Sequence, residues 1–504
     1  MPNVKRDNLV YYVSIVVMLI LVGIGLVLPD IFGSVTNSIF GFLSKYFGWW
    51  YMVAMNCFVL FPIILAFSRF GKLKLGEENS KPEFSNTAWF GMLFGAGMGV
   101  GLVFYGVGEP MYHLGTPPFG AEPGSAQAAE DALRATFFHW GLHPWAGYAV
   151  IALCLAYFQF RKGAPGLMSS LFLPILGEKG HLTPLGRTID VLTIFATVAG
   201  VATSLGLAVM QINSGLAYLF NIPSGVGVQL GILIALGVVY TYTAVTGIDK
   251  GIKFLGNLNL FLVCLLSCAL LLLGPTLVII ESMVTAVGSY FSNLIEESFN
   301  VAPYGGAYKE WLGGWTVYYW AWWIAWAPFV GSFIARISRG RTIRQFVAGV
   351  LFVPAIGSFC WFSIFGGTAL DMQLSGAADI AKSVGEDLST GVFAMYQHIT
   401  LGGVMSAVMV LLICTFFITS ANSSTFVLSM YSTEGELNPP KGRMVVWGVM
   451  QAAFAFVLLM TGGLKALQIA SITAAGPFSI IMVLACVCLW KTLNNDFADG
   501  AEIK

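Results

Sequence analysis

This sequence has few charged residues. Only 10% of its 504 residues are Asp, Glu, Lys or Arg, and the 25 basic residues balance the 25 acidic ones. The basic residues are dispersed among the loops rather than clustered, which gives no indication of nucleic-acid binding. Apolar residues make up 57% of the chain, so the sequence predicts a polytopic membrane protein.

Several kinds of reactive site are also missing. The eight cysteines all fall within apolar segments, so they predict no extramembrane disulfide framework and no Cys/His cluster with metal-ligand spacing. No nucleophile and base stand at a usable spacing, which argues against a membrane enzyme and against an enzymatic cofactor. The apolar run Leu9–Pro29 is too long for the core of a cleavable signal peptide.

Carboxylates are missing from the predicted membrane interior. Asp190 and Asp249 lie at the ends of predicted spans, and Glu109 lies just past one. Ionisable groups inside a span usually mark a proton or ion pathway. The sequence therefore argues against a carboxylate proton relay as the driving machinery.

Long apolar runs, by contrast, are abundant. A run of about 20 apolar residues can cross the hydrocarbon core, and a helix satisfies its own backbone there. We predict twelve spans, at 9–29, 49–68, 86–107, 135–160, 190–211, 226–247, 254–275, 314–335, 345–368, 402–430, 444–462 and 466–490. With the N-terminus inside, most Lys and Arg residues fall in the inside loops, which predicts a cell (inner or plasma) membrane protein with both termini cytoplasmic.

The eighth predicted span is the richest in aromatic residues. Trp315, Tyr319, Trp322, Trp326 and Phe329 follow helical spacing and share one face, and Trp320 and Trp323 lie on an adjacent face. The central tryptophans fall near mid-membrane, where an interfacial belt does not account for them. Their rings either pack against other helices or line a cavity, and an aromatic cavity attracts quaternary ammonium groups.

The third predicted span carries alternating glycines at positions 95, 97, 99 and 101. Each glycine weakens a helix by about 1 kcal/mol relative to alanine. Two interpretations stay open: close helix packing through small residues, or an unwound segment whose backbone coordinates an ion or a substrate.

The fourth predicted span begins with aromatic and histidine residues. Trp140, Trp145 and Tyr148 could line a pocket, and Pro144 is predicted to kink the helix. His139 and His143 are one turn apart, a spacing that could bind a metal. Because no acidic third ligand stands nearby in the sequence, a structural role is favoured for both histidines.

Hydroxyl groups gather in two further spans. Thr197, Thr203 and Ser204 lie in the fifth, and the segment 415–425 of the tenth is dense in Ser, Thr and Asn. Such groups either bond within and between helices or, together with carbonyl groups, suit a hard cation such as Na⁺. The moderately apolar segment 277–300 is predicted to be an amphipathic interfacial helix that joins two halves.

Three motifs carry a resemblance to a known family. They are FYGVGEP (104–110), FHWGLHPWAGY (138–148) and YWAWW…PFVG…ARISRGR (319–341). The chain resembles the betaine/carnitine/choline transporter family over nearly its whole length, most of all the sodium-coupled glycine betaine transporters. The resemblance implies an all-α, LeuT-like core of two inverted five-helix repeats, formed by the predicted spans 3–7 and 8–12.

The resemblance also implies a division of the chain. It places two additional helices in 1–85, the first repeat in 86–275, the amphipathic connection in 276–312, the second repeat in 313–490 and a short cytoplasmic tail in 491–504. Members of the family commonly form trimers, so we expect a homotrimer in the lipid bilayer. The long basic tail of osmosensing members is not matched, which argues against direct osmotic gating.

Carried over position by position, the resemblance implies the ligand sites. The trimethylammonium box is formed by Trp140, Trp145, Tyr148 and Trp323, with Trp322 and Trp326 further along the path. The substrate carboxylate meets backbone amides near Ala96, Gly97, Met98, Gly99 and Gly101. One Na⁺ site comprises the backbone of Gly95 and Met98 with Phe416, Thr419 and Ser420, and a second comprises Tyr148, Thr197 and Phe329.

Three positions discriminate subtypes within the resemblance. Gly101 stands where choline-selective members tend to carry Asp, which favours a zwitterion such as glycine betaine. Asn259 stands where the sodium-independent carnitine exchanger has Arg, which favours an open Na⁺ site. Val201 departs from the Thr of some sodium-coupled members, which leaves the Na⁺ stoichiometry open.

The expected function is therefore uptake of a quaternary-ammonium zwitterion, with glycine betaine first, by Na⁺ symport in osmoprotection. The alternatives are sodium-independent exchange of carnitine- or butyrobetaine-type substrates, proton-coupled choline uptake, and a membrane sensor that binds betaine without moving it.

Overall fold

The computed structural model describes residues 8–97, 99–246 and 249–498. Within these ranges the chain is helical apart from loops and one isolated bridge between Lys74 and Thr342, which confirms the prediction of an all-α protein. The helices are α1 Leu9–Val27, α2 Pro29–Phe67, α3 Asn86–Gly97, α4 Val100–Gly115, α5 Ala126–Trp140, α6 Leu142–Lys162, α7 Leu173–Leu176, α8 Pro184–Phe220, α9 Val226–Thr246, α10 Asp249–Leu273, α11 Thr276–Phe299, α12 Ala307–Gly314, α13 Thr316–Ile337, α14 Ile343–Leu374, α15 Ile380–Glu386, α16 Gly391–Tyr396, α17 Gly402–Tyr431 and α18 Lys441–Ala498. Short 3-10 turns lie at Arg69–Lys72, Ser169–Phe172, Gly180–Leu182 and Leu388–Thr390.

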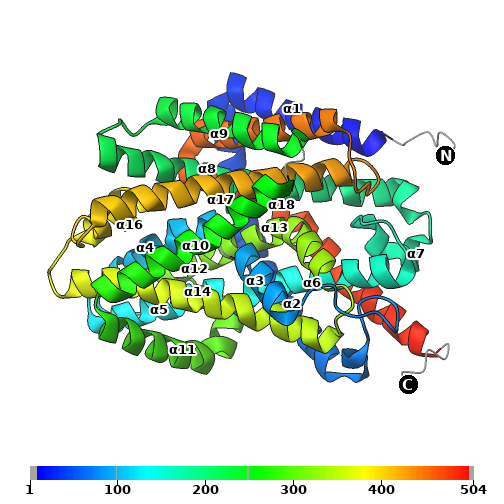
Figure 1. Ribbon diagram of the computed structural model, residues 1–504, viewed down its shortest axis with the longest axis horizontal. Coiled ribbons are helices and arrows are strands. Elements are labelled where there is room, and N and C mark those ends of the chain that lie inside the picture. The colour runs from blue at the N-terminus through cyan, green and yellow to red at the C-terminus, as the bar shows by residue number, and fades with distance from the viewer. Residues whose placement is uncertain (1–7, 98, 247–248, 499–504) are drawn as a thin grey trace.

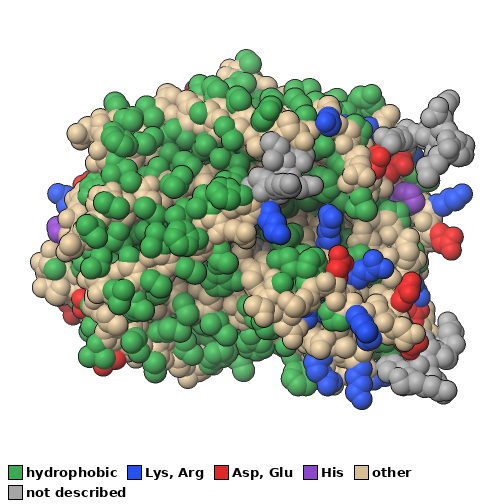
Figure 2. Space-filling view, viewed as in Figure 1, with side chains coloured by type: hydrophobic (Ala, Val, Ile, Leu, Met, Phe, Trp, Pro, Cys, Tyr) green, Lys and Arg blue, Asp and Glu red, His purple; other side chains and the backbone are tan. Residues whose placement is uncertain are grey.

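The outer surface is that of a multi-pass membrane protein. Long helices run side by side along the length of the molecule, and the start of α1 and the end of α18 lie at the same end of it (Figure 1). The space-filling view shows a broad apolar band, with most of the Lys and Arg side chains of this face at the end where the two termini lie (Figure 2). Apolar side chains on the outside are stable when lipid rather than water surrounds them.

By length and composition, ten helices of the described chain could cross a membrane, or eleven if α3 and α4 form one bent span. The twelve predicted ranges all fall on helices, and the last two share α18, which is interrupted at Gly462 and Gly463. The aromatic-rich α13 is not among the ten, whereas α11 is. The number twelve and the interfacial position of α11 stay predictions.

The glycine-rich third span is broken. α3 ends at Gly97 and α4 begins at Val100, the two axes are bent by 62°, and Gly99 before α4 is extended, with φ −151° and ψ −176°. The interruption agrees with the unwound-segment interpretation. The break leaves the first amides of α4 without partners inside their own helix.

The fourth span is also broken, but not at the predicted residue. α5 ends at Trp140, Gly141 has non-helical angles, and Pro144 lies in the first turn of α6. The prediction that Pro144 kinks the helix is wrong, because proline is tolerated in a first turn, where its missing N–H would be unpaired anyway. The break at Gly141 turns His139 and His143 toward different neighbours.

Helix α13 lies at the centre of the molecule. It packs against α6, α8 and α18, while α4 packs against α5, α14 and α8. The arginine-rich loop after α13 is fastened to the chain before α3: the Arg341 carbonyl accepts from Leu75 N, and the Arg341 guanidinium lies over the Trp89 ring at 3.9 Å. The ends of the two helices expected to meet the substrate are therefore joined.

Candidate functional site

Four aromatic side chains form a continuous group that we call the aromatic box: Trp140, Trp145, Tyr148 and Trp323. The ring centroids of Trp140 and Trp323 are 4.8 Å apart, those of Trp323 and Tyr148 are 6.4 Å apart, and those of Tyr148 and Trp145 are 5.4 Å apart. Each pair is close to perpendicular and all four residues are buried. α5, α6 and α13 thus bring together the residues predicted for the trimethylammonium box, whose role stays a prediction.

The indole N–H groups around the box are held by oxygen acceptors. Trp323 Nε1 donates to the carbonyl of His139 at 3.1 Å, a group near the break between α5 and α6. Trp322 and Trp326 both donate to the carbonyl of Gly200 in α8, at 3.4 and 2.7 Å. These bonds fix ring orientation, since an indole has one donor and its plane must follow it.

Helical spacing alone did not separate the tryptophans of α13 by role. Trp322 stacks on Trp323, with ring centroids 4.8 Å apart and planes 17° apart. Trp320 points elsewhere: its Nε1 lies 3.1 Å from Met52 Sδ, and its ring stacks on His143 at 4.8 Å. Trp320 therefore joins α13 to α2 and α6, whereas Trp323 belongs to the box.

Gly101, in the first turn of α4, touches the aromatic rings. A Cβ atom there would lie 2.5 Å from Trp322 Cη2 and 3.0 Å from Trp140 Cη2. Packed indoles cannot give way as a flexible side chain does, so only glycine fits without moving the rings. The amides at the start of α4, which suit an anion, consequently lie next to the box.

Of the other residues predicted for the substrate carboxylate, Gly99 precedes α4 directly. Ala96 and Gly97 form the end of α3, and Met98 lies outside the described residues. The structure thus brings Gly101 to the rings, and the binding role of the amides at Gly99–Gly101 stays a prediction.

The largest correction to the sequence analysis concerns Glu109. It was predicted to lie past the end of a span, but α4 continues to Gly115 and Glu109 is fully buried, with 0% of its surface exposed. The prediction that Glu109 lies past the end of the helical span is therefore wrong, and the protein does bury a carboxylate. A hydropathy window ends the span at the first charged residue, because it does not register that the charge has partners.

Four polar groups surround the Glu109 carboxylate. Its Oε2 accepts from Trp140 Nε1 at 2.8 Å and from the Tyr319 hydroxyl at 2.5 Å. Its Oε1 lies 2.6 Å from His139 Nδ1 and 3.4 Å from His113 Nε2. The partners come from α4, α5 and α13, so one carboxylate joins the three helices beside the box.

His139 consequently has the acidic neighbour that the sequence analysis did not find. The ligand atoms of Glu109, His113 and His139 all lie within 4.8 Å of one another, a spacing that could hold a metal ion. In the structure, however, the nitrogens are already used: Trp311 Nε1 donates to His113 Nδ1 at 3.2 Å, and His139 Nε2 lies 2.9 Å from Thr316 Oγ1. The arrangement is that of a closed hydrogen-bond network.

His143 takes no part in that network. Its Nε2 lies 3.1 Å from Ser298 Oγ and 3.4 Å from Asn56 Oδ1, which places it between α2 and α11. These partners, with the stacked Trp320 ring, give His143 the structural role that the sequence favoured.

Around the first predicted Na⁺ site, the Thr419 hydroxyl of α17 faces α10. Thr419 Oγ1 donates to carbonyls of its own helix, at 3.0 Å to Thr415 and 3.1 Å to Phe416, and it accepts from Asn259 Nδ2 at 3.2 Å. Asn259 is buried and its Oδ1 has no hydrogen-bond partner in the described chain. Asn259 therefore lies beside Thr419, where its oxygen offers an unused acceptor.

The remaining members of this site are less closely placed. Phe416 is buried and Ser420 is partly buried on α17, Gly95 is on α3, and α10 contacts both helices. Met98 is again outside the described residues. The Na⁺ assignment at these residues stays a prediction.

The second predicted Na⁺ site draws on three helices. Thr197 of α8 is fully buried and donates to the Thr193 carbonyl at 2.8 Å, which leaves its lone pairs available. Tyr148 is in α6 and Phe329 in α13, and α13 packs against both α6 and α8. Val201, one turn after Thr197, is buried and adds no oxygen. This assignment also stays a prediction.

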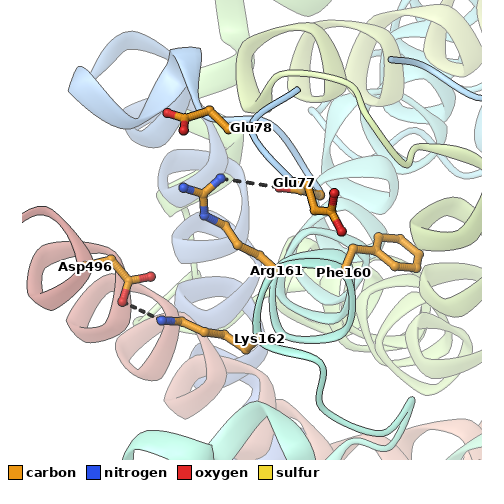
Figure 3. A pocket seen from close by; sticks show the side chains of 7 residues that line it. Glu77, Glu78, Phe160, Arg161, Lys162 and Asp496 are labelled. Atoms are coloured by element: carbon orange, nitrogen blue, oxygen red, sulfur yellow. Dashed lines mark hydrogen bonds and ion pairs between the residues drawn. The ribbon is translucent and has the colours of Figure 1, made fainter. Parts of the chain in front are cut away.

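A separate pocket of about 430 Å³ opens at the end of α6 (Figure 3). Lys162 pairs with Asp496 of α18 at 2.6 Å, and Arg161 donates to the Gly76 carbonyl at 3.3 Å. Glu77 and Glu78 line the same pocket. Its charges are of both signs, and the Lys162–Asp496 pair joins the end of α6 to α18, so the pocket does not present a site of one sign.

Glu109 was the functional candidate that sequence reasoning missed. Tyr105, Glu109 and His113 recur every four residues, so a helix continuing past residue 107 places them on one face. The Tyr105 ring lies 5.3 Å from that of Tyr319 and 6.1 Å from those of Trp140 and Trp322. That periodicity was the available signal.

Comparisons with known proteins agree with the motifs. The family described as "BCCT, betaine/carnitine/choline family transporter" matches residues 9–498. The chain is 48% identical over 492 residues to the glycine betaine transporter OpuD of Bacillus subtilis, covering 98% of this chain and 95% of that protein. It is 42% identical to a probable glycine betaine transporter of Desulfitobacterium hafniense, with 98% of both chains covered, and 44% identical to the ectoine/hydroxyectoine transporter of Virgibacillus pantothenticus, with 97% of both covered.

Proposed function

Because this chain belongs to the betaine/carnitine/choline transporter family, we propose that it takes up glycine betaine together with Na⁺ across the cell membrane. The family and these relatives are transporters, which confirms that the chain is a transporter and not an enzyme. The single observation that carries the substrate class is the box of four buried rings beside the amide-bearing start of α4.

The box suits a cation that has no hydrogen-bond donors. A trimethylammonium group is a bulky, weakly hydrated cation, and ring faces attract it by about 2 kcal/mol per contact when water is excluded. Its methyl groups also fill apolar space, which a primary ammonium group with three donors would not do as well. The carboxylate of the same zwitterion would then meet the amides at Gly99–Gly101.

Sodium would bind near the end of α3, before the break in the span, whereas the carboxylate would bind at the start of α4, after the break. An ion held by Thr419, Ser420 and backbone oxygens near Gly95 would fix the geometry between α3 and α4, and this would order the amides for the carboxylate. Hard cations prefer such hydroxyl and carbonyl oxygens. Asn259 is only 6% exposed, and its Oδ1 has no hydrogen-bond partner in the described chain. This unused acceptor supports a site that can still accept a cation.

Topology and assembly belong to the same proposal. We propose that both termini are cytoplasmic, since the start of α1 and the end of α18 lie at the same end of the molecule, which is the end rich in Lys and Arg (Figures 1 and 2). The inverted repeats, the homotrimer and a role in osmoprotection remain expectations from the family resemblance.

The test is uptake of radiolabelled glycine betaine into proteoliposomes, first with an inward Na⁺ gradient and then with K⁺ in place of Na⁺. The proposal predicts uptake with Na⁺ alone, and no uptake into empty liposomes. Equal uptake in both salts would overturn symport and favour exchange, which preloaded carnitine would reveal as counterflow. Binding without any transport would indicate a sensor.

The ectoine relative makes a second substrate worth including in that test. Ectoine is also a zwitterion, but its positive charge is spread over an amidine group that carries N–H donors. Competition by unlabelled ectoine that exceeds competition by unlabelled glycine betaine would assign the chain to that substrate instead.

A further inference from the structure

The buried carboxylate of Glu109 touches the edge of the aromatic box. It accepts from the indole N–H of Trp140, a box residue, at 2.8 Å. It also accepts from the hydroxyl of Tyr319, whose ring stacks on that of Trp323 with 5.7 Å between centroids and 17° between planes. Two rings that contact Trp323, and that lie 5.5 Å from each other, are therefore bonded to one carboxylate.

The hydrogen-bond pattern assigns a negative charge to Glu109. An indole can only donate, so Trp311 places the lone pair of His113 at Nδ1 and its proton at Nε2, which then donates to Glu109. Trp140 and Tyr319 donate as well. His139 adds a fourth donor, because its Nδ1 lies 2.6 Å from the carboxylate, and its Nε2 lies 2.9 Å from the Thr316 hydroxyl. Four donors around one carboxylate stabilise its anionic form.

A carboxylate in this position acts on a bound cation in two ways. Its charge attracts the cation directly, and the interaction is strong because the surroundings are buried and of low dielectric constant. In addition, hydrogen bonds polarise the groups that form them, so the Trp140 N–H bond shifts electron density into the indole and strengthens its negative face. Both effects depend on the ligand's charge and not on its shape.

We propose that Glu109 is a specificity-determining residue that makes the aromatic box select a cationic headgroup over an uncharged headgroup of the same shape. The inference rests on the proposed betaine function. It assigns the selectivity for charge to a residue behind the rings, while the rings themselves supply the shape.

The experiment compares two ligands that differ in one atom of the headgroup. Glycine betaine carries a trimethylammonium group, and 3,3-dimethylbutyrate carries a tert-butyl group of the same shape on the same carboxylate chain. Competition against radiolabelled glycine betaine in purified protein gives the affinity ratio for each variant. The variant is Glu109→Gln, and the control is Asp190→Asn. The control neutralises another buried carboxylate, which accepts from the backbone N–H and the hydroxyl of Ser169, a residue outside the box.

For Glu109→Gln we expect the preference for glycine betaine over the isostere to fall at least tenfold, through loss of betaine affinity, while Asp190→Asn leaves the ratio unchanged. Equal loss of both ligands would overturn the inference, because it would show that Glu109 only supports the fold of the site. An unchanged ratio would overturn it as well. If the unaltered protein binds no glycine betaine, the proposed function fails, and that result is distinct from either.

A second variant covers the case in which Glu109→Gln does not fold. Tyr319→Phe removes one donor to the carboxylate but keeps its charge and the stacked ring. The inference predicts that the preference for the cationic ligand is kept or increased, since the charge is less compensated. A preference that falls as the phenol is removed would contradict it.

Discussion

The aromatic box and the Thr419 region differ in how completely their polar groups are paired. Around the box, the indoles of Trp140 and Trp323 each have an acceptor, and the rings are packed against one another. Near Thr419, the Asn259 oxygen has no hydrogen-bond partner among the described residues, and Ser420 is only partly buried. This difference agrees with the proposal that the box is a preformed site for the organic cation, whereas a small ion would complete the Thr419 region.

The largest effect should follow from removing the ring at the centre of the box. Trp323→Leu removes contacts to Trp140, Tyr148 and Trp322 at once. With about 2 kcal/mol per cation–π contact, we expect glycine betaine affinity to fall by about 30-fold or more, measured by binding to purified protein.

Trp320→Phe is the matched control for that prediction. Trp320 lies on the same helix but packs against Met52 and His143, so the substitution should lower thermal stability and leave affinity within about twofold. Retained affinity in Trp323→Leu, or equal losses in both variants, would remove the distinction between box and packing residues.

A smaller but still large effect is expected at Gly101. Gly101→Ala adds a Cβ that meets Trp322 and Trp140, and overpacking of this kind typically destabilises by about 1–3 kcal/mol. Glycine betaine affinity should fall by about tenfold, as measured by equilibrium binding. Gly91→Ala, on α3 with open space around its Cβ, is the control, and the account fails here if the two variants behave alike.

A substitution of Thr419 should change the Na⁺ dependence of uptake. Thr419→Val removes the hydroxyl that accepts from Asn259 and keeps the shape of the side chain. We expect the Na⁺ concentration for half-maximal uptake to rise by about tenfold, the scale of one hydrogen-bond partner of a charged group, with betaine uptake recovering at high Na⁺. Uptake that falls at all Na⁺ concentrations alike would contradict an ion-binding role.

The smallest effect is expected from a substitution of Trp326. Trp326→Phe removes one indole bond to the Gly200 carbonyl, while Trp322 still donates to the same oxygen. The free energy of unfolding should fall by about 1 kcal/mol, and a thermal shift assay would measure it. A loss of betaine affinity larger than that of Gly101→Ala would place Trp326 in the box itself.

The helices and the pairing of Trp140 with Trp323 could be anticipated from sequence, because apolar length and family motifs carry that information. The break at Gly141 could not, since Pro144 was the stronger local signal and the chain bends three residues earlier. Glu109 was misplaced for a similar reason. Its burial depends on donors from α5 and α13 that are distant in sequence, and no local window contains them.

We propose that the box and the Thr419 region are coupled, so that each ligand changes the affinity of the protein for the other. The measurement is glycine betaine affinity as a function of Na⁺ concentration, and Na⁺ affinity with and without betaine, in the same purified protein. We expect glycine betaine and Na⁺ each to increase the affinity of the protein for the other by the same factor. Betaine affinity that does not change with Na⁺ would contradict it.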